Sequence, residues 1–438
     1  MRIKMLWPVI GSVKETRTLK ELAFTEGFQT NHQQQRSITL GVDASKLLSS
    51  LKGTHSTHTL QTFFSVLCQY SEASVVLFFV FNDSNRRKGL RRDAIELIRR
   101  FGYYSTEVEG EAGCYLASLS HSHVVDGVLS EDGDLLALGV DVLLQQPRGS
   151  STDRLTYDVY SAKWIEEDTD LGREGMILVA LLCENNDGVR DCDIGAVVQL
   201  ARSGLGKELV EEFEHLSQEH QSLKDYKCSW RARVKDELSL NRNGYMERRH
   251  PELAAHINER FPSLQLLEYY INTPSALNPE DATYLNQTLK PTLPDIAGIV
   301  SFCRERFQWS DTRMLRRFKD NLFKGAINRM LYSPLIAFDA REQTFRERSW
   351  QIQVLRESSQ QRFDDGIEQV KVTFSLAGLM RVATLAVQQS MRQTVWVPLP
   401  VFLVTKLPRG LSQVQYDQAA SGQEPDADSE ERRDHWTL

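Results

Sequence analysis

The 438-residue sequence lacks the features of several large protein classes. Its six cysteines form no CxxC pair and do not lie at zinc-finger spacing from histidines, so we expect reduced thiols rather than a zinc site. The longest apolar run, residues 75–81, is too short to span a bilayer. The first ten residues lack a long apolar stretch and a cleavage site. We therefore expect no signal peptide and no membrane partner.

A strong positive charge is also missing. The formal net charge is −7, whereas many nucleic-acid-binding proteins are basic overall. Any contact with DNA must therefore come from local basic patches, or else no nucleic acid binds. The hydrophobic share of 41% is typical of globular proteins, and the length is sufficient for two or three domains.

Acidic residues follow three strand-like segments in the first half of the chain. Residues 37–42 end at Asp43, residues 75–81 end at Asn82 and Asp83, and residues 124–129 precede Asp132 and Asp134. Helical patterns at 60–70, 91–101 and 111–119 separate them, which favours an α/β fold with a parallel sheet. Because such sheets bind ligands beyond the carboxyl ends of their strands, the sequence predicts a shared acidic edge.

The second half of the chain has a different pattern. Residues 176–335 are almost entirely helical in character, and 315–331 form an amphipathic pattern with a basic face. Residues 370–377 and 394–404 are typical of strands in a small β module. The acidic and polar segment from residue 413 onward has the composition of a disordered tail.

Several of these segments resemble the XPG/flap-endonuclease family of structure-specific nucleases. GVDAS (41–45) resembles the family's first acidic motif, and residues 110–139 resemble its internal nuclease region in order and spacing. Residues 188–206 resemble its helix-two-turn-helix motif. FPSLQLLEYYIN (261–272), FKDNLFKGAINRML (318–331) and the late β module resemble Holliday junction resolvases of the GEN/Yen type.

The resemblance implies a division of the chain into four parts. Residues 1–175 would form a PIN-like α/β nuclease domain with a mostly parallel central sheet, and 176–335 would form the helix-two-turn-helix and a helical extension. Residues 336–412 would form a small β-containing, chromodomain-like module. Residues 413–438 would form a disordered acidic tail.

The resemblance also implies a magnesium site, with Mn²⁺ as an alternative ion. Two-ion phosphodiester hydrolysis needs clustered carboxylates, because Mg²⁺ prefers hard oxygen ligands. The implied catalytic residues and metal ligands are Asp43, Glu111, Asp132 and Asp134. Asp83 and Asp187 are further candidate ligands.

The chain departs from the family pattern at several of these positions. Asn82 stands where the family has an aspartate, and Gly113 stands at its second glutamate. The basic arch that clamps DNA is short, and Asp191 and Asp193 replace glycines that approach phosphate. We therefore predict weak or absent cleavage.

The implied partner is branched or flapped DNA, which would place the protein in the nucleus, and a homodimer on a junction stays open. The candidate DNA-binding residues lie near the short arch and in the helix-two-turn-helix region: Arg86, Arg87, Lys88, Arg91, Arg92, Arg190 and Lys207.

Two functional hypotheses remain open at this point. The chain is an active structure-specific endonuclease of DNA repair and recombination, or it is a catalytically dead relative that binds DNA junctions or proteins. An incomplete gene model would also explain the short arch. Taken singly, Asp43, Asp132 and Asp134 are more typical of turns and helix caps, but together with Glu111 they favour a remnant of a metal site.

Overall fold

The computed structural model of the chain describes most residues between 7 and 398 and divides them into two compact units, 1–292 and 293–438. The described residues are 7–29, 37–51, 56–83, 88–147, 155–183, 193–216, 219–273, 277–332, 338–339, 344–345, 353–364, 367–383, 385 and 391–398. The division at 292–293 falls inside the predicted helical region 176–335. Among the described residues, no helix combines the length and apolar character needed to cross a membrane.

The first unit is built on a seven-stranded sheet with the strand order β1-β7-β6-β5-β2-β3-β4. Five neighbouring strands, from β6 to β4, run parallel, while β7 and β1 are antiparallel to their neighbours. The strands are β1 (Glu15–Thr18), β2 (Thr39–Asp43), β3 (Val76–Asn82), β4 (Tyr104–Val108), β5 (Gly127–Leu129), β6 (Val142–Gln145) and β7 (Thr156–Ser161). The predicted α/β fold with a mostly parallel sheet is confirmed.

The order of the strands creates a switch point between β2 and β5. From β2 the chain continues through β3 to β4 on one side, and it then crosses back to β5 and β6 on the other side of β2. In open parallel sheets such a reversal leaves a crevice at the carboxyl ends of the two central strands. Asp43 closes β2, and the loop after β5 carries Asp132, so these two residues lie at the switch point.

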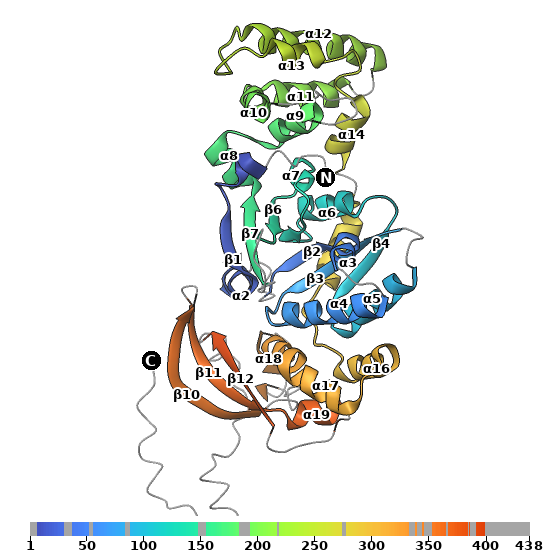
Figure 1. The fold of residues 1–438 in the computed structure, drawn as a ribbon, viewed down its shortest axis with the longest axis vertical. Helices are drawn as coiled ribbons and strands as arrows, with labels where there is room; N and C mark the ends of the chain where they lie inside the picture. The colour runs from blue at the N-terminus through green and yellow to red at the C-terminus, as the bar shows by residue number, and fades with distance from the viewer. Residues whose placement is uncertain are drawn as a thin grey trace, which may run out of the picture. The chain divides into compact units, whose positions relative to one another are not determined.

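Helices cover the sheet and set the positions of the strand ends (Figure 1). α6 packs on β2 and β3, α5 packs on β4, and α3 contacts both β2 and β3. β3 coincides with the strand-like run at 75–81, and its nearly continuous apolar sequence suits a strand that is buried on both faces. The helices are α1 (Trp7–Ile10), α2 (Leu19–Leu22), the π-helical η1 (Ala23–Gln29), α3 (Ala44–Ser50), α4 (Ser56–Ser71), α5 (Lys88–Arg100), α6 (Ala112–His121) and α7 (Asp134–Ala137).

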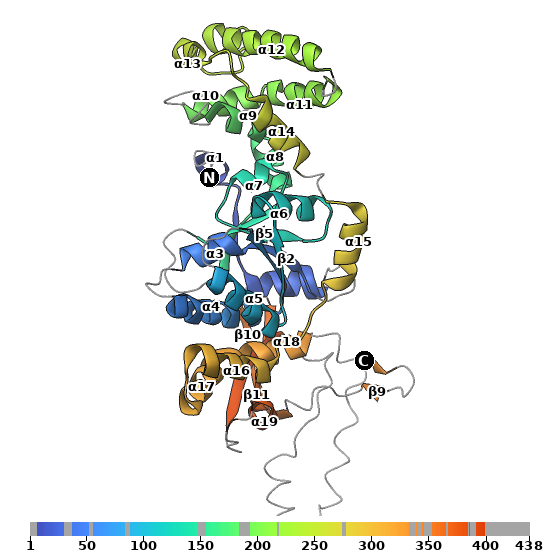
Figure 2. The ribbon, with the colours of Figure 1, turned by 90° about the vertical axis from the view of Figure 1, so that its right-hand side faces the viewer.

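A helical region follows the sheet in the same unit. α9 packs against α10, α11 and α14, and α12 lies beside α13 (Figure 2). The fully buried Trp230 of α12 donates its indole N–H to the carbonyl oxygen of Leu205 at 3.1 Å and stacks on Phe261. These helices are α8 (Ala162–Thr169), α9 (Arg173–Cys183), α10 (Ile194–Ala201), α11 (Leu205–Leu216), α12 (His220–Leu240), α13 (Pro251–His256), α14 (Leu264–Asn272) and α15 (Pro279–Thr288).

The second unit combines helices with a three-stranded antiparallel sheet of order β10-β11-β12. α18 contacts β12, and α16 contacts α19. Its elements are α16 (Ile296–Phe307), α17 (Asp311–Arg317), the π-helical η3 (Phe318–Leu322), α18 (Phe323–Tyr332), β8 (Phe338–Asp339), β9 (Thr344–Phe345), β10 (Gln353–Asp364), β11 (Ile367–Ser375), α19 (Ala377–Val382) and β12 (Arg392–Pro398).

Two predicted elements of the second unit end earlier or are subdivided. The strand expected over 370–377 ends at Ser375, whose hydroxyl accepts the backbone N–H of Ala377 at 3.3 Å, and Ala377 begins α19. The helix expected over 315–331 contains a π-helical stretch, η3, between α17 and α18. The predicted strand 394–404 is described only as far as Pro398, and the predicted tail lies outside the described residues.

Candidate nuclease site at the carboxyl edge of the sheet

Two of the predicted acidic residues, Asp43 and Asp132, come together at the switch point. Asp43 and Asp132 are buried, with exposed fractions of 4% and 8%, and Asp134 is buried two residues further along. The Asp132 carboxylate accepts the backbone N–H of Asp134 at 3.3 Å, and the Asp132 N–H is donated to the Ser130 hydroxyl at 3.2 Å. We refer to Asp43, Glu111, Asp132 and Asp134 as the acidic edge.

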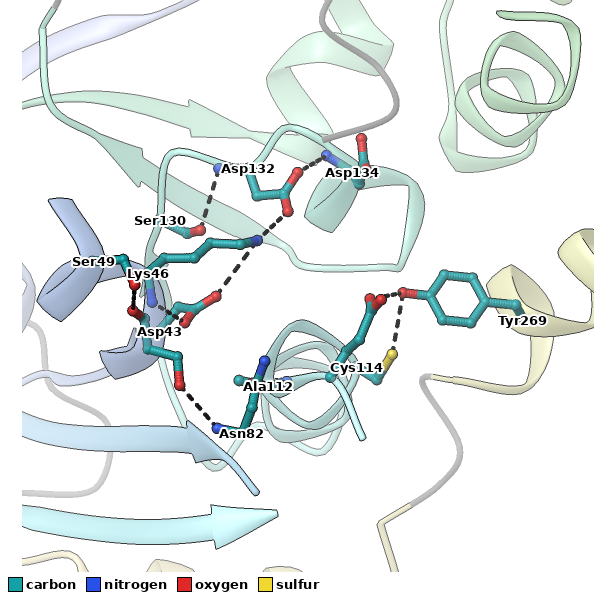
Figure 3. Close-up of polar contacts among 12 residues, drawn as sticks. Asp43, Lys46, Ser49, Asn82, Ala112, Cys114, Ser130, Asp132, Asp134 and Tyr269 are labelled. Atoms are coloured by element: carbon teal, nitrogen blue, oxygen red, sulfur yellow. Dashed lines mark hydrogen bonds and ion pairs between the residues drawn. The ribbon is translucent and has the colours of Figure 1, made fainter. Parts of the chain in front are cut away.

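Lys46 lies between Asp43 and Asp132, as Figure 3 shows. Its ammonium forms a hydrogen-bonded ion pair with Asp132 and lies 3.5 Å from Asp43 Oδ2. Asp43 is also the N-cap of α3, because its Oδ1 accepts the Lys46 backbone N–H at 2.9 Å. Local helix geometry thus places the Lys46 side chain over the carboxylate that begins its own helix.

The electrostatics of this group follow from burial and opposite charge. Burial raises the pKa of Asp43, and the nearby Asp132 raises it further, against the lowering effect of the bonds from Lys46. Desolvation lowers the pKa of Lys46, but the hydrogen bond and charge of Asp132 outweigh it, so the net shift is upward. The lysine is therefore charged at neutral pH and supplies positive charge to two buried carboxyl groups.

Glu111 is held separately, by a residue from the helical region. The Tyr269 hydroxyl of α14 donates to Glu111 Oε2 at 2.8 Å, and the Cys114 thiol donates to the Tyr269 oxygen at 3.3 Å. Burial raises the pKa of Tyr269, as do the neighbouring Cys114 and Glu111, so the phenol stays protonated and acts as a donor. Figure 3 shows Tyr269 reaching toward α6 beside Cys114.

Asn82 has a structural role at the position where the family resemblance implies an aspartate. Its side-chain oxygen accepts the backbone N–H of Ala112 at 2.8 Å, at the first turn of α6. Its backbone N–H is donated to the Ser45 hydroxyl at 3.0 Å. The amide thus links the end of β3 to the start of α6, and its oxygen already has a hydrogen-bond partner.

Asp83 is not part of the acidic edge and instead lies beside Arg91. It is exposed and lies 3.5 Å from the guanidinium of Arg91. Arg91 also bonds Glu107 at 2.9 Å and the Asn82 carbonyl oxygen at 3.0 Å. Arg91, a candidate DNA contact, therefore holds the ends of β3 and β4 together with its largely covered side chain.

The other candidate DNA contacts divide into two groups. Lys88 and Arg92 are exposed on α5, where Arg92 lies 3.6 Å from Asp93. Lys207 is exposed on α11, 3.9 Å from Glu211. The remaining candidates lie outside the described residues: Arg86, Arg87, Arg190 and the candidate ligand Asp187.

The helix-two-turn-helix region contains Asp193, where the resemblance implies a glycine. Asp193 is the N-cap of α10 and accepts the Gly195 N–H at 3.1 Å. Its carboxylate also bonds Arg248 at 3.1 Å, and this bond is the main reason why the pKa of Asp193 is lowered. The Asp193 side chain therefore stabilises the start of α10 and forms an ion pair with Arg248.

The resulting donor set does not fit a two-ion centre as it is arranged. Such a centre needs several oxygen ligands not already neutralised by another cation. Lys46 pairs with Asp43 and Asp132, Tyr269 bonds Glu111, and Gly113 supplies no donor. Within the described part of the chain, no group of three or more His, Cys, Asp or Glu side chains is placed to hold a metal ion. The predicted magnesium ligands stay predictions.

The sequence interpretation missed Lys46 and Tyr269. The three-residue spacing between Asp43 and Lys46 at a helix start is a local signal that could have indicated their pairing. No local signal links Lys46 to Asp132 or Tyr269 to Glu111, because these partners are 86 and 158 residues apart in the sequence.

The chain combines a mostly parallel sheet that has an acidic carboxyl edge with a helical region and a small antiparallel sheet. Residues 101–188 match the XPG I-region. Over 143 residues the chain is 30% identical to flap endonuclease GEN of Drosophila melanogaster, covering 31% of this chain and 18% of that protein. The chain thus matches less than a fifth of the length of this relative.

Solved structures extend the similarity to nearly the whole chain. The Holliday junction-resolving enzyme GEN1 in complex with product DNA and Mg²⁺ has a TM-score of 0.72 at 25% identity, covering 96% of this chain and 100% of that one. A GEN1 structure with product DNA, Mg²⁺ and Mn²⁺ gives a TM-score of 0.71, again at 25% identity. The chain thus resembles XPG nucleases over its I-region, and its fold is similar to that of the junction-resolving enzyme GEN1.

Proposed function

We propose that this protein recognises branched DNA, such as four-way junctions or flaps, and hydrolyses it slowly if at all. The DNA-binding part of the proposal is supported by the similarity of the fold to GEN1, which extends over 96% of this chain. That GEN1 structure contains product DNA. The exposed Lys88, Arg92 and Lys207 are the described candidates for phosphate contacts.

The arrangement of the acidic edge supports the slow-hydrolysis part of the proposal. Phosphodiester hydrolysis needs charge stabilisation at the attacking and leaving oxygens, which carboxylate-bound ions supply in two-ion enzymes. In this chain the two buried carboxylates, Asp43 and Asp132, already share the positive charge of Lys46. The position between β3 and α6 holds an amide rather than a carboxylate.

Binding is tested with the purified full chain on labelled substrates. We expect a four-way junction or flap to bind roughly tenfold more tightly than a linear duplex of equal length, and affinity to fall steeply between 50 and 200 mM salt. Lys88→Gln combined with Arg92→Gln should weaken binding to all substrates and make the salt dependence shallower. Equal affinity for junction and duplex would contradict the proposal.

Cleavage is measured separately, under single-turnover conditions with Mg²⁺ or Mn²⁺. We expect little product over hours from a substrate that is fully bound in the gel-shift assay. The matched control is Asp132→Ala, which removes a buried carboxylate of the acidic edge. Rapid cleavage that disappears in this variant would show that the protein is an efficient nuclease and would refute the slow-hydrolysis part alone.

A further inference from the structure

The acidic edge contains a cation that belongs to the chain itself. The Lys46 ammonium is bonded to Asp132 and lies 3.5 Å from Asp43. Both carboxylates are almost fully buried, whereas about half of the Lys46 side chain, 49%, is exposed. The Lys46 side chain thus extends from the solvent side to a position between Asp43 and Asp132. These two residues follow the neighbouring parallel strands β2 and β5.

The fold fixes this arrangement from two directions. β2 and β5 are adjacent in the sheet, with Val42 in register with Leu129, so the residues after them lie close together. Lys46 is anchored in the first turn of α3, because its own N–H is bonded to Asp43. The long, flexible side chain needs no rearrangement of the backbone to reach Asp132.

The charge balance distinguishes this group from an open metal site. Two carboxylates and one ammonium carry a net charge of −1, and the ammonium can donate to both acids at once. A divalent ion entering here would meet the positive charge of Lys46 at a few ångströms, a separation at which like charges repel by several kcal/mol even at moderate dielectric. The ion would have to displace the lysine from both partners.

The neighbouring oxygen donors other than Asp134 do not compensate for this repulsion. Asn82 contributes a neutral oxygen that already accepts the Ala112 N–H. Glu111 accepts from Tyr269, on the side of α6 that faces the helical region. A divalent ion would therefore find only part of the charge that it needs for tight binding.

We propose that Lys46 is a built-in counter-cation of the acidic edge, which takes the charge-balancing place of a divalent ion and keeps such ions from binding between Asp43 and Asp132. The acidic edge is then a structural ion cluster, and DNA recognition proceeds without a divalent metal. This inference takes its DNA partner from the proposed function. The test therefore measures metal binding by the chain in the absence of DNA, so that its result does not depend on DNA binding.

The experiment is a titration of Mn²⁺ followed by electron paramagnetic resonance of the free ion. The chain is compared with Lys46→Met, Lys46→Arg and Lys46→Met combined with Asp132→Asn. The matched control is Lys20→Met, because Lys20 also forms a lysine–carboxylate pair, with Glu72 at 2.8 Å, and has a similar exposed fraction of 47%.

We expect the unaltered chain, Lys46→Arg and Lys20→Met to bind Mn²⁺ equally weakly. Lys46→Met should bind Mn²⁺ at least about tenfold more tightly, because the repulsion is removed, and Asp132→Asn should abolish the gain. No gain in Lys46→Met, checked for folding by circular dichroism, would overturn the proposal.

A second arm does not depend on the folding of Lys46→Met. If the unaltered chain binds Mn²⁺ tightly and Asp132→Asn alone removes that binding, the ion already occupies the acidic edge and the proposal is wrong. A gel-shift assay with EDTA completes the test: we expect unchanged junction affinity. Loss of junction preference with and without metal would instead count against the proposed function, so the two failures are distinguishable.

Discussion

Two parts of the acidic edge hold their carboxylates in different ways. Asp43 and Asp132 are buried and share the positive charge of Lys46, whereas Glu111 is exposed and accepts a hydrogen bond from the neutral Tyr269 hydroxyl. Burial makes the ionised form of a carboxylate costly, so the buried pair requires an opposite charge. The exposed Glu111 keeps water as a partner, and one neutral donor is sufficient to orient it.

Asn82 links these two parts without adding charge, because it bonds Ser45 near Asp43 and Ala112 next to Glu111. Its amide oxygen caps the first turn of α6, and α6 begins directly after Glu111. The comparison therefore predicts that mutations lower the free energy of unfolding to different degrees. The largest loss is expected for the charged contact of Lys46.

The largest effect is expected where the charged contact is broken. Lys46→Met leaves Asp43 and Asp132 buried without their cation, so we expect the free energy of unfolding at pH 7 to fall by about 1–3 kcal/mol. This loss is smaller than the cost of breaking a fully buried ion pair, because about half of the Lys46 side chain is exposed. Urea denaturation followed by circular dichroism measures the change. Adding Asp132→Asn should restore part of the loss, and Lys20→Met should cost under about 1 kcal/mol. Equal losses in the two lysine variants would contradict the comparison.

A smaller effect is expected at the neutral residue between the two parts. Asn82→Ala removes the acceptor for the Ala112 N–H, and we expect a loss of about 1 kcal/mol, the usual cost of deleting a helix-capping side chain. Asn82→Asp keeps an acceptor oxygen and should stay within about 0.5 kcal/mol of the unaltered chain in the same denaturation assay. If the alanine and aspartate variants are equally unstable, the capping interpretation fails.

The smallest effect is expected at Tyr269. Tyr269→Phe removes the hydroxyl that bonds Glu111 but keeps the ring, and water can replace the lost donor, so we expect about 0.5–1 kcal/mol. Thermal unfolding of this variant beside Tyr284→Phe, which alters an exposed tyrosine, measures the difference. A loss in Tyr269→Phe that exceeds that of Lys46→Met would show that the neutral contact, not the charged one, dominates the acidic edge.

Much of the fold could be predicted from local patterns. The apolar run at 75–81 appears as the buried strand β3, and the acids after three strands made a shared edge the simplest expectation. The strand expected over 124–129 is shorter, because only Gly127–Leu129 pairs with its neighbours. The π-helical stretch in 315–331 has no simple sequence signature, since its hydrogen bonding depends on how the flanking helices pack.

The candidate site was predictable in position but not in bonding. Asp43, Glu111, Asp132 and Asp134 were expected to converge. Asp43 and Asp132 share Lys46 after β2 and β5, whereas Glu111 is held separately by Tyr269. Arg91 was expected at the DNA, yet its contacts to Asp83 and Glu107 depend on the pairing of β3 with β4.

The sequence by itself determined the alternation of strands and helices and the acids that follow the strands, because hydrophobic periodicity and turn preference are local properties of the chain. Only the tertiary structure decided which polar groups meet. Lys46 reaches Asp132, and Tyr269 reaches Glu111, because the strand order and the packing of α14 near α6 bring residues from distant parts of the sequence within hydrogen-bond distance.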